Sequence, residues 1–140
     1  MEHHLTTYIT HDTLISVLGF GTQENLEAIR SYHSGITLQT DKRIADTPLL
    51  AATLSQERLQ QQAEAIGVSG YPRMEQLFIL TINELIRQSG QTLEDKTCGL
   101  ILSTTKGNID LLARHTEHPD EAVFLWKMAE NIAGYFHAEE

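Results

Sequence analysis

The sequence has one cysteine, three prolines and no apolar run long enough to span a membrane. A single cysteine cannot form an internal disulfide, so nothing in the chain requires an oxidising compartment. Its start also lacks the basic stretch and apolar core of a secretory signal. We therefore expect a cytoplasmic protein that does not enter the membrane.

Basic residues are scarce as well. Ten Lys and Arg stand against 19 Asp and Glu, which gives a formal net charge of −9 at pH 7. Nucleic-acid binding needs clustered Lys and Arg to neutralise phosphates, and anionic membranes attract basic segments. The balance therefore argues against nucleic acid and membrane as partners. With 140 residues, 41% of them hydrophobic, we expect a single folded domain over residues 1–140.

Four segments have the pattern of β-strands. A β-branched apolar stretch predicts a strand within Thr6–Ser16, and alternation of apolar and polar residues predicts another over Ile36–Thr40. Pro48–Leu54 is compatible with a buried strand or an extended segment. Cys98–Leu102 is continuously apolar, which is typical of a strand buried on both faces of a largely parallel sheet.

Helices are predicted between these strands. The strongest lies between Pro72 and Gly90 and is apolar over much of its circumference, so we expect it to be packed on more than one side. The other predicted helices span Gln23–Tyr32 with Thr22 as N-cap, Gln56–Ile66 with Ser55 as N-cap, and Asp120–Phe136. Strands that alternate with helices predict an α/β fold.

Two blocks of sequence carry a more specific pattern. The first reads Ile9-Thr-His-Asp-Thr-Leu-Ile-Ser-Val-Leu-Gly19, continues through the first predicted helix and closes with Ser34-Gly35-Ile36. The second begins with Arg73-Met-Glu-Gln76, runs through the strongest helix and an acidic linker, and closes with Cys98-Gly-Leu-Ile-Leu-Ser-Thr-Thr-Lys-Gly-Asn108. Together they cover a little under half of the chain.

In order and spacing the two blocks resemble the N-terminal part of the β-ketoacyl synthases, the condensing enzymes of the thiolase superfamily. The family patterns are I-T-G-x-G-x-[IV]-[ST]-P-x-G before a helix and S-G-I, and later R-x-x-Q before a helix, an acidic linker and V-G-[VL]-[IV]-x-G-T-x-x-G-G. This chain departs from them at His11 and Thr13, where the family has glycines, and at Val17, where it has proline.

The resemblance implies the N-terminal portion of a thiolase-like α/β fold, a mixed sheet with packed helices. It also implies a 3-oxoacyl-ACP synthase, an acyltransferase that condenses an acyl group with malonyl-ACP in fatty-acid or polyketide-type biosynthesis. The partner would be an acyl carrier protein, and the substrates would be acyl groups on its phosphopantetheine arm, with no cofactor bound by the chain itself.

The loop of the second block is the candidate acyl-pocket loop, and it contains Thr104, Thr105, Lys106 and Gly107. In the family an apolar residue at the position of Lys106 often gates chain length. Lys106 therefore indicates either an altered pocket or a loop that faces solvent or the acidic surface of a carrier.

No catalytic residue is assigned. The family uses a cysteine at the N-terminus of a buried helix and two later residues, usually histidines. Cys98 aligns instead with the apolar position before the glycine of a strand, so we expect a buried, inert thiol. His115 and His118 have a spacing that suits a metal, but no cysteine or aspartate partner lies nearby, so no metal site is predicted.

By resemblance, then, the chain is expected to be the N-terminal part of a longer synthase, truncated before the nucleophile and inactive alone. Half of a two-part fold leaves apolar faces uncovered, so we expect a homo-oligomer, a complex with the remaining half of the fold, or a partly molten monomer. Two alternatives stay open: a non-catalytic module of the same fold, similar to a chain-length factor, and an unrelated small α/β binding domain.

Overall fold

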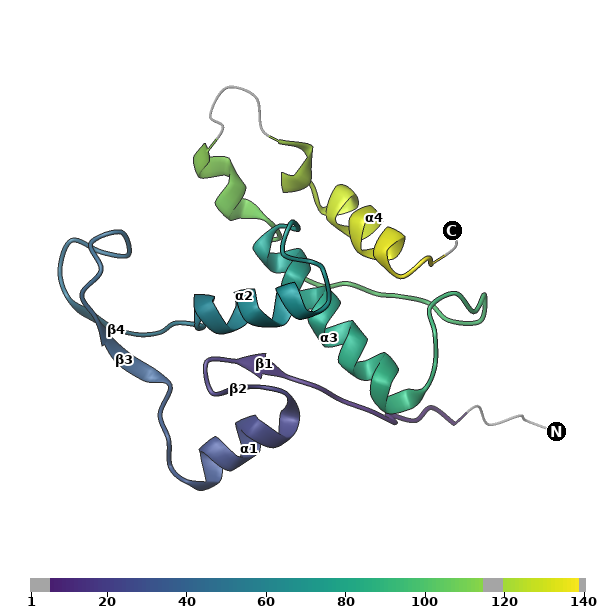
Figure 1. Cartoon of the computed structure of the whole chain (residues 1–140), viewed down its shortest axis with the longest axis horizontal. Helices are drawn as coiled ribbons and strands as arrows, with labels where there is room; N and C mark the ends of the chain where they lie inside the picture. The colour runs from purple at the N-terminus through teal and green to yellow at the C-terminus, as the bar shows by residue number, and fades with distance from the viewer. Residues whose placement is uncertain (1–5, 115–119, 139–140) are drawn as a thin grey trace.

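The computed structural model describes residues 6–114 and 120–138. Within these ranges the fold is mixed α/β, with four α-helices and two small antiparallel sheets of two strands each. The helices α2 (Gln56–Ala65), α3 (Arg73–Ser89) and α4 (Leu125–Tyr135) lie together. The hairpin of β3 (Ile36–Gln39) and β4 (Leu49–Ala52) projects away from them (Figure 1). In the described part of the chain, no helix has the length and apolar character needed to cross a membrane.

The N-terminal unit consists of strands β1 (Ile15–Ser16) and β2 (Gly19–Phe20) and helix α1 (Thr22–Arg30). The buried Asn25 joins hairpin and helix, because its Nδ2 donates to the carbonyls of Leu14, Gly19 and Gly21 at 3.1, 3.0 and 2.8 Å. Its Oδ1 accepts a hydrogen bond from Ser16 Oγ. This single amide fixes the path of the chain into α1.

Two predictions for this unit need correction. Thr22 is the first helical residue and its hydroxyl donates to Asp12 Oδ2 at 2.7 Å, so Gly21 occupies the N-cap position. Of the strand predicted within Thr6–Ser16, only Ile15–Ser16 pairs with another strand. Residues 6–14 pair with no other strand, although the Leu14 carbonyl accepts a hydrogen bond from the N–H of Gly21 at 2.8 Å.

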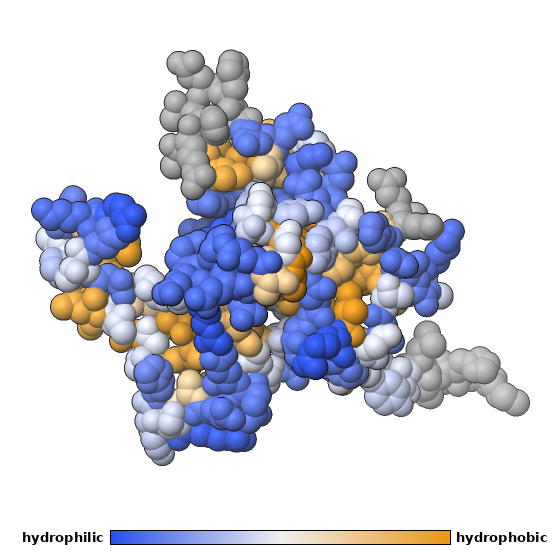
Figure 2. Space-filling model, viewed as in Figure 1, coloured by the Kyte–Doolittle hydropathy of each residue, from blue (hydrophilic) through white to orange (hydrophobic). Residues whose placement is uncertain are grey.

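Strands β3 (Ile36–Gln39) and β4 (Leu49–Ala52) pair antiparallel, with Leu38 opposite Leu50. The predicted strand over Ile36–Thr40 is confirmed to within one residue. Pro48–Leu54 does contain a strand, but its residues alternate between half-buried and exposed, because the hairpin packs on no second layer. One face of the hairpin is apolar and exposed, as the orange surface of the projecting lobe shows (Figure 2).

Helices α2 (Gln56–Ala65), α3 (Arg73–Ser89) and α4 (Leu125–Tyr135) form the core. The predicted ends are confirmed where local chemistry sets them. Ser55 Oγ accepts from the N–H of Arg58 at 3.2 Å, and Gly90 ends α3 in the left-handed region with φ 69°. The core side chains come from all three helices and the segments beside them: Ala63, Val68, Ile79, Ile82, Met128, Ile132 and Phe136.

The last predicted helix, Asp120–Phe136, is interrupted. A short 3₁₀ helix, η2 (Glu121–Val123), precedes α4, and the extended backbone of Phe124 (ψ 137°) separates the two. Another 3₁₀ helix, η1 (Ile109–Arg114), follows the candidate acyl-pocket loop. Asp120 accepts from the N–H of Ala122 at 3.0 Å, so it caps η2 instead of opening one long helix.

The strand predicted over Cys98–Leu102 is wrong. This segment has no strand partner, and Ile101 is 94% exposed while Leu100 and Leu102 pack against the core. Its side chains therefore alternate between exposed and partly buried, as in a strand. A strand buried on both faces, however, needs a neighbouring strand at each edge and a packed layer on each side, and this segment has no strand beside it in the described structure. Cys98 is accordingly half-buried, not the fully buried thiol that was expected.

Candidate functional site

The loop Thr104–Gly107 forms a tight turn closed by its own first residue. Thr104 Oγ1 accepts hydrogen bonds from the backbone N–H groups of Lys106 and Gly107, at 3.3 and 3.0 Å. Thr105 and Lys106 are exposed, whereas Gly107 is buried. The loop therefore presents the Lys106 ammonium to solvent and turns its glycine toward the protein.

Gly107 lies close to the start of α4. Its φ of 54° lies in the left-handed region that favours glycine. A Cβ placed on it would lie 2.6 Å from Leu125 Cδ2, at the first residue of α4. The backbone conformation therefore favours glycine at this position, and a larger residue would also displace the end of the Leu125 side chain.

The next residue, Asn108, connects the loop to two other parts of the fold. Its Nδ2 donates to Glu75 Oε1 and to the carbonyl of Ala122, each at 2.8 Å. Asn131 of α4 also donates to Glu75, at 3.4 Å to Oε1 and 3.2 Å to Oε2. Glu75 and Asn108 are both 0% exposed. We call Glu75, Asn108 and Asn131 the Glu75 cluster.

The Glu75 cluster contains a buried carboxylate whose direct partners are neutral amides. Burial raises the pKa of Glu75 above its ordinary range, while hydrogen bonds from Asn108 and Asn131 and the positive charge of Lys127 act in the opposite direction. Lys127 Nζ itself binds Glu130 at 2.9 Å. The negative charge of Glu75 is therefore balanced mainly by N–H dipoles and not by a contacting cation.

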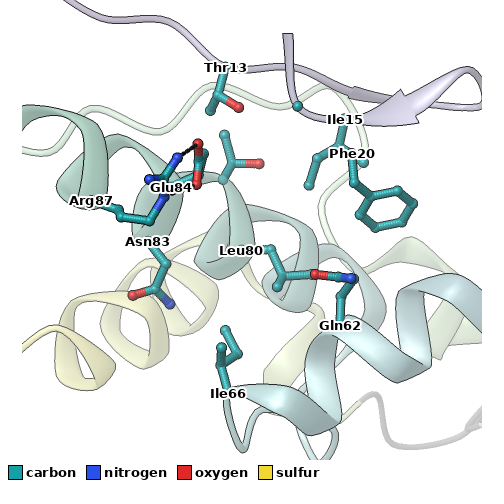
Figure 3. Close-up of a pocket in the computed structure, with 11 residues that line it drawn as sticks. Thr13, Ile15, Phe20, Gln62, Ile66, Leu80, Asn83, Glu84 and Arg87 are labelled. Carbon is teal, nitrogen blue, oxygen red and sulfur yellow. Dashed lines mark hydrogen bonds and ion pairs between the residues drawn. The ribbon is translucent and has the colours of Figure 1, made fainter. Parts of the chain in front are cut away.

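Among the hollows on the described surface, two border strand β1 and helix α3. One, of about 230 Å³, lies between the β1–β2 hairpin, α2 and α3, with Phe20 on one side and the Glu84–Arg87 ion pair on the other (Figure 3). The other, of about 530 Å³, is a mostly apolar groove between β1, the end of β4 and α3, and Arg73 is its charged residue. Neither is lined by the loop Thr104–Gly107.

The structure thus brings the predicted loop against a polar cluster that the sequence analysis did not identify. One signal was available: Glu75 lies four and seven residues before Ile79 and Ile82, so it shares their buried helix face. A carboxylate on such a face needs a partner inside the protein. Within the described residues no group of three or more His, Cys, Asp and Glu side chains is placed to hold a metal ion, and His115 and His118 lie outside those residues.

Comparison of the chain with models of protein families, with curated proteins and with solved structures finds no match.

Proposed function

We propose that the chain is the N-terminal part of a β-ketoacyl synthase with a thiolase-like fold. In this proposal it contributes the acyl-pocket loop Thr104–Gly107 to an enzyme that condenses an acyl group with malonyl-ACP, in fatty-acid or polyketide-type biosynthesis. The nucleophilic cysteine and the two decarboxylation residues would lie in the remainder of the synthase. The 140-residue chain alone would then be inactive.

The observation that carries this proposal is the contact between Glu75 and Asn108. The two residues belong to opposite ends of the second sequence block, one in Arg73–Gln76 and the other in Ser103–Asn108. They lie 33 residues apart, yet their side chains meet at 2.8 Å in a fully buried position. The two ends of the block therefore form one packed unit in the fold, and this is what supports treating the block as a unit in the proposal.

The unpaired segments of the structure give further support. Tyr8 and Ile9 are 76% and 95% exposed, and Ile101 is similarly exposed, although all three occur in segments with the sequence pattern of strands. Strand-forming segments without partners are the expected result when the sheet that would hold them is incomplete. The exposed apolar face of the β3–β4 hairpin supports the same interpretation.

The exposure of Lys106 favours one of the two roles considered for it. Its side chain extends from a turn whose glycine, not its lysine, faces the protein. An ammonium group in that position suits contact with the acidic surface of a carrier protein better than a place inside an apolar pocket.

The test is to read the coding sequence beyond codon 140 and purify its full product. Incubation with acyl-CoA or acyl-ACP, followed by intact mass and peptide mapping, should show one acyl adduct on a cysteine downstream of residue 140. Cys98→Ser is the matched control and should leave the adduct unchanged. Absence of a downstream cysteine with an intact fold would favour the non-catalytic module, and an adduct on Cys98 would overturn the proposal.

A further inference from the structure

We propose that Glu75 is the positioning residue of the loop Thr104–Gly107, that it acts through Asn108, and that its charged form holds the loop most tightly. The assignment of this loop to an acyl pocket rests on the proposed function. The positioning itself is a property of the chain and is tested on the chain alone.

The loop has few other attachments. In the part of the chain that the structure describes, the hydrogen bonds of Thr104, Lys106 and Gly107 stay within the loop. Asn108 is the first residue after the turn whose side chain reaches another element. Gly107 adds a close approach to Leu125 but no polar contact to it. Leu102 packs against the core just before the loop, but the polar attachment of the loop lies at its C-terminal end.

At that end, one carboxylate joins three elements. Glu75 comes from the first turn of α3, Asn108 from the segment after the loop, and Asn131 from α4. The Asn108 Nδ2 has two acceptors, whereas its Oδ1 is buried without a hydrogen-bond partner. Loss of the Glu75 acceptor therefore leaves Asn108 with the Ala122 carbonyl alone, and no second acceptor is in place to replace it.

The charge of Glu75 matters because a carboxylate is a stronger acceptor than a neutral carboxyl or amide oxygen. Hydrogen bonds with one ionised partner are roughly twice as strong as those between neutral groups. The charged groups near the Glu75 cluster are Lys127 of α4, Glu130, which pairs with Lys127, and Glu121 of η2, which also acts on Lys127. None of the three makes the bond to Asn108, so the loop should respond to the protonation of Glu75 itself.

The experiment is an NMR titration of the 140-residue chain from pH 4 to 8. It follows the side-chain carboxyl carbon of Glu75, the Nδ2 protons of Asn108 and the backbone order of residues 104–107. We expect all three to change with one shared midpoint, and the protection of the Gly107 amide to fall about tenfold when Glu75 becomes neutral.

Glu75→Gln is the decisive variant, because it keeps the shape and an acceptor oxygen but has no charge. At every pH, the loop of this variant should be as mobile as the wild-type loop is at low pH. Glu84→Gln, which neutralises a surface carboxylate on the same helix, should leave the titration of the loop unchanged. A wild-type loop that titrates with a different midpoint from Glu75, or a Glu75→Gln loop that still titrates, would overturn the proposal.

The wild-type comparison of midpoints needs no variant, so the test stands even if Glu75→Gln folds poorly. Its outcome is also separate from that of the acylation experiment. If the loop titrates with Glu75 but the full product has no synthase activity, this inference stands and the proposed function is rejected. If the full product is an active synthase but the loop does not titrate with Glu75, the proposed function stands and this inference is rejected.

Discussion

The guanidinium of Arg58 in α2 binds both carboxylate oxygens of Glu24 in α1, 34 residues earlier in the chain. The same guanidinium lies 4.8 Å from the centre of the Phe20 ring, and Glu24 Oε2 also accepts from the N–H of Phe20 at 2.8 Å. This pair connects the N-terminal unit to the helical core. It does so at a site where each side chain is still 40% exposed.

Breaking this pair should have a modest effect. The hydrogen bond from Arg58, followed by that from the Phe20 N–H, lowers the pKa of Glu24. Its stabilisation is therefore present above the ordinary pKa of Glu and is lost as pH falls through the folded value. A double-mutant cycle with Glu24→Gln and Arg58→Met in urea should give a coupling of about 1 kcal/mol at pH 7, since solvent screens exposed pairs.

Glu27→Gln serves as the control for that cycle, because Glu27 lies on the exposed face of α1, where its carboxylate accepts a hydrogen bond from Gln23 of the same helix at 2.8 Å. A coupling that is the same at pH 3 and pH 7 would contradict the assignment of this energy to the charged form of Glu24.

Gly107→Ala should destabilise the chain by about 1–3 kcal/mol, because a non-glycine residue is strained at a positive φ and the added methyl group meets Leu125. Gly70→Ala is the matched control, since nothing lies within 4 Å of a Cβ at that glycine. Thermal unfolding followed by circular dichroism measures both. If the two variants melt alike, the close approach of the loop to α4 is wrong.

Stability should also depend on pH through Glu75. The bond from Asn108 favours the charged form, but burial has the larger effect and raises the folded pKa of Glu75. The contribution of Glu75 to the global unfolding free energy is therefore most favourable below the ordinary pKa of Glu and is lost as pH rises through the folded value. The unfolding free energy of the wild type should therefore decline relative to that of Glu75→Gln as pH rises from about 4.5 to 7. Urea titrations at several pH values measure the difference.

Glu84→Gln provides the contrast for this series. The hydrogen bond from Arg87 holds the pKa of Glu84 at about 2, so Glu84 stays charged over the same pH range. The decrease in unfolding free energy caused by Glu84→Gln should therefore be nearly constant there. A wild-type profile parallel to that of Glu75→Gln would mean that the buried carboxylate does not change its charge there.

The β3–β4 hairpin should promote self-association. Leu38 and Leu50 face each other across the strands and are 62% and 71% exposed, and neither strand carries a charge. Sedimentation velocity should show association that increases with concentration and is weakened by Leu38→Thr with Leu50→Thr. Gln39→Thr, on the other face of the hairpin, should leave it unchanged; a compact monomer at all concentrations would exclude this role.

The parts of the fold that the sequence predicts correctly depend on nearby residues. Ser55 and Gly90 set helix ends through contacts within four residues, and the apolar pattern of α3 follows from its own periodicity. The strand over Cys98–Leu102 could not be decided in this way. Its pattern is that of a strand, but strand formation requires a neighbour that this segment lacks in the described structure.

The candidate site, too, could be predicted from the sequence only where it depends on neighbouring residues. The loop Thr104–Gly107 is visible in the sequence as a polar, glycine-containing stretch after an apolar run. Its partner Glu75 is not visible in this way, because it lies 33 residues before Asn108 and the two come together only in the folded chain. The sequence shows that Glu75 is a charged residue on an otherwise apolar helix face, but it does not show which amide groups bind its carboxylate.

The Asn25 amide has a consequence for the order of folding. Each of its four hydrogen bonds spans 11 residues or fewer, so the entropy lost in closing these loops is small. Contacts this local form early and quickly. The contacts within the N-terminal unit are therefore expected to form before the contact of Arg58 with Glu24, which closes a loop of 34 residues.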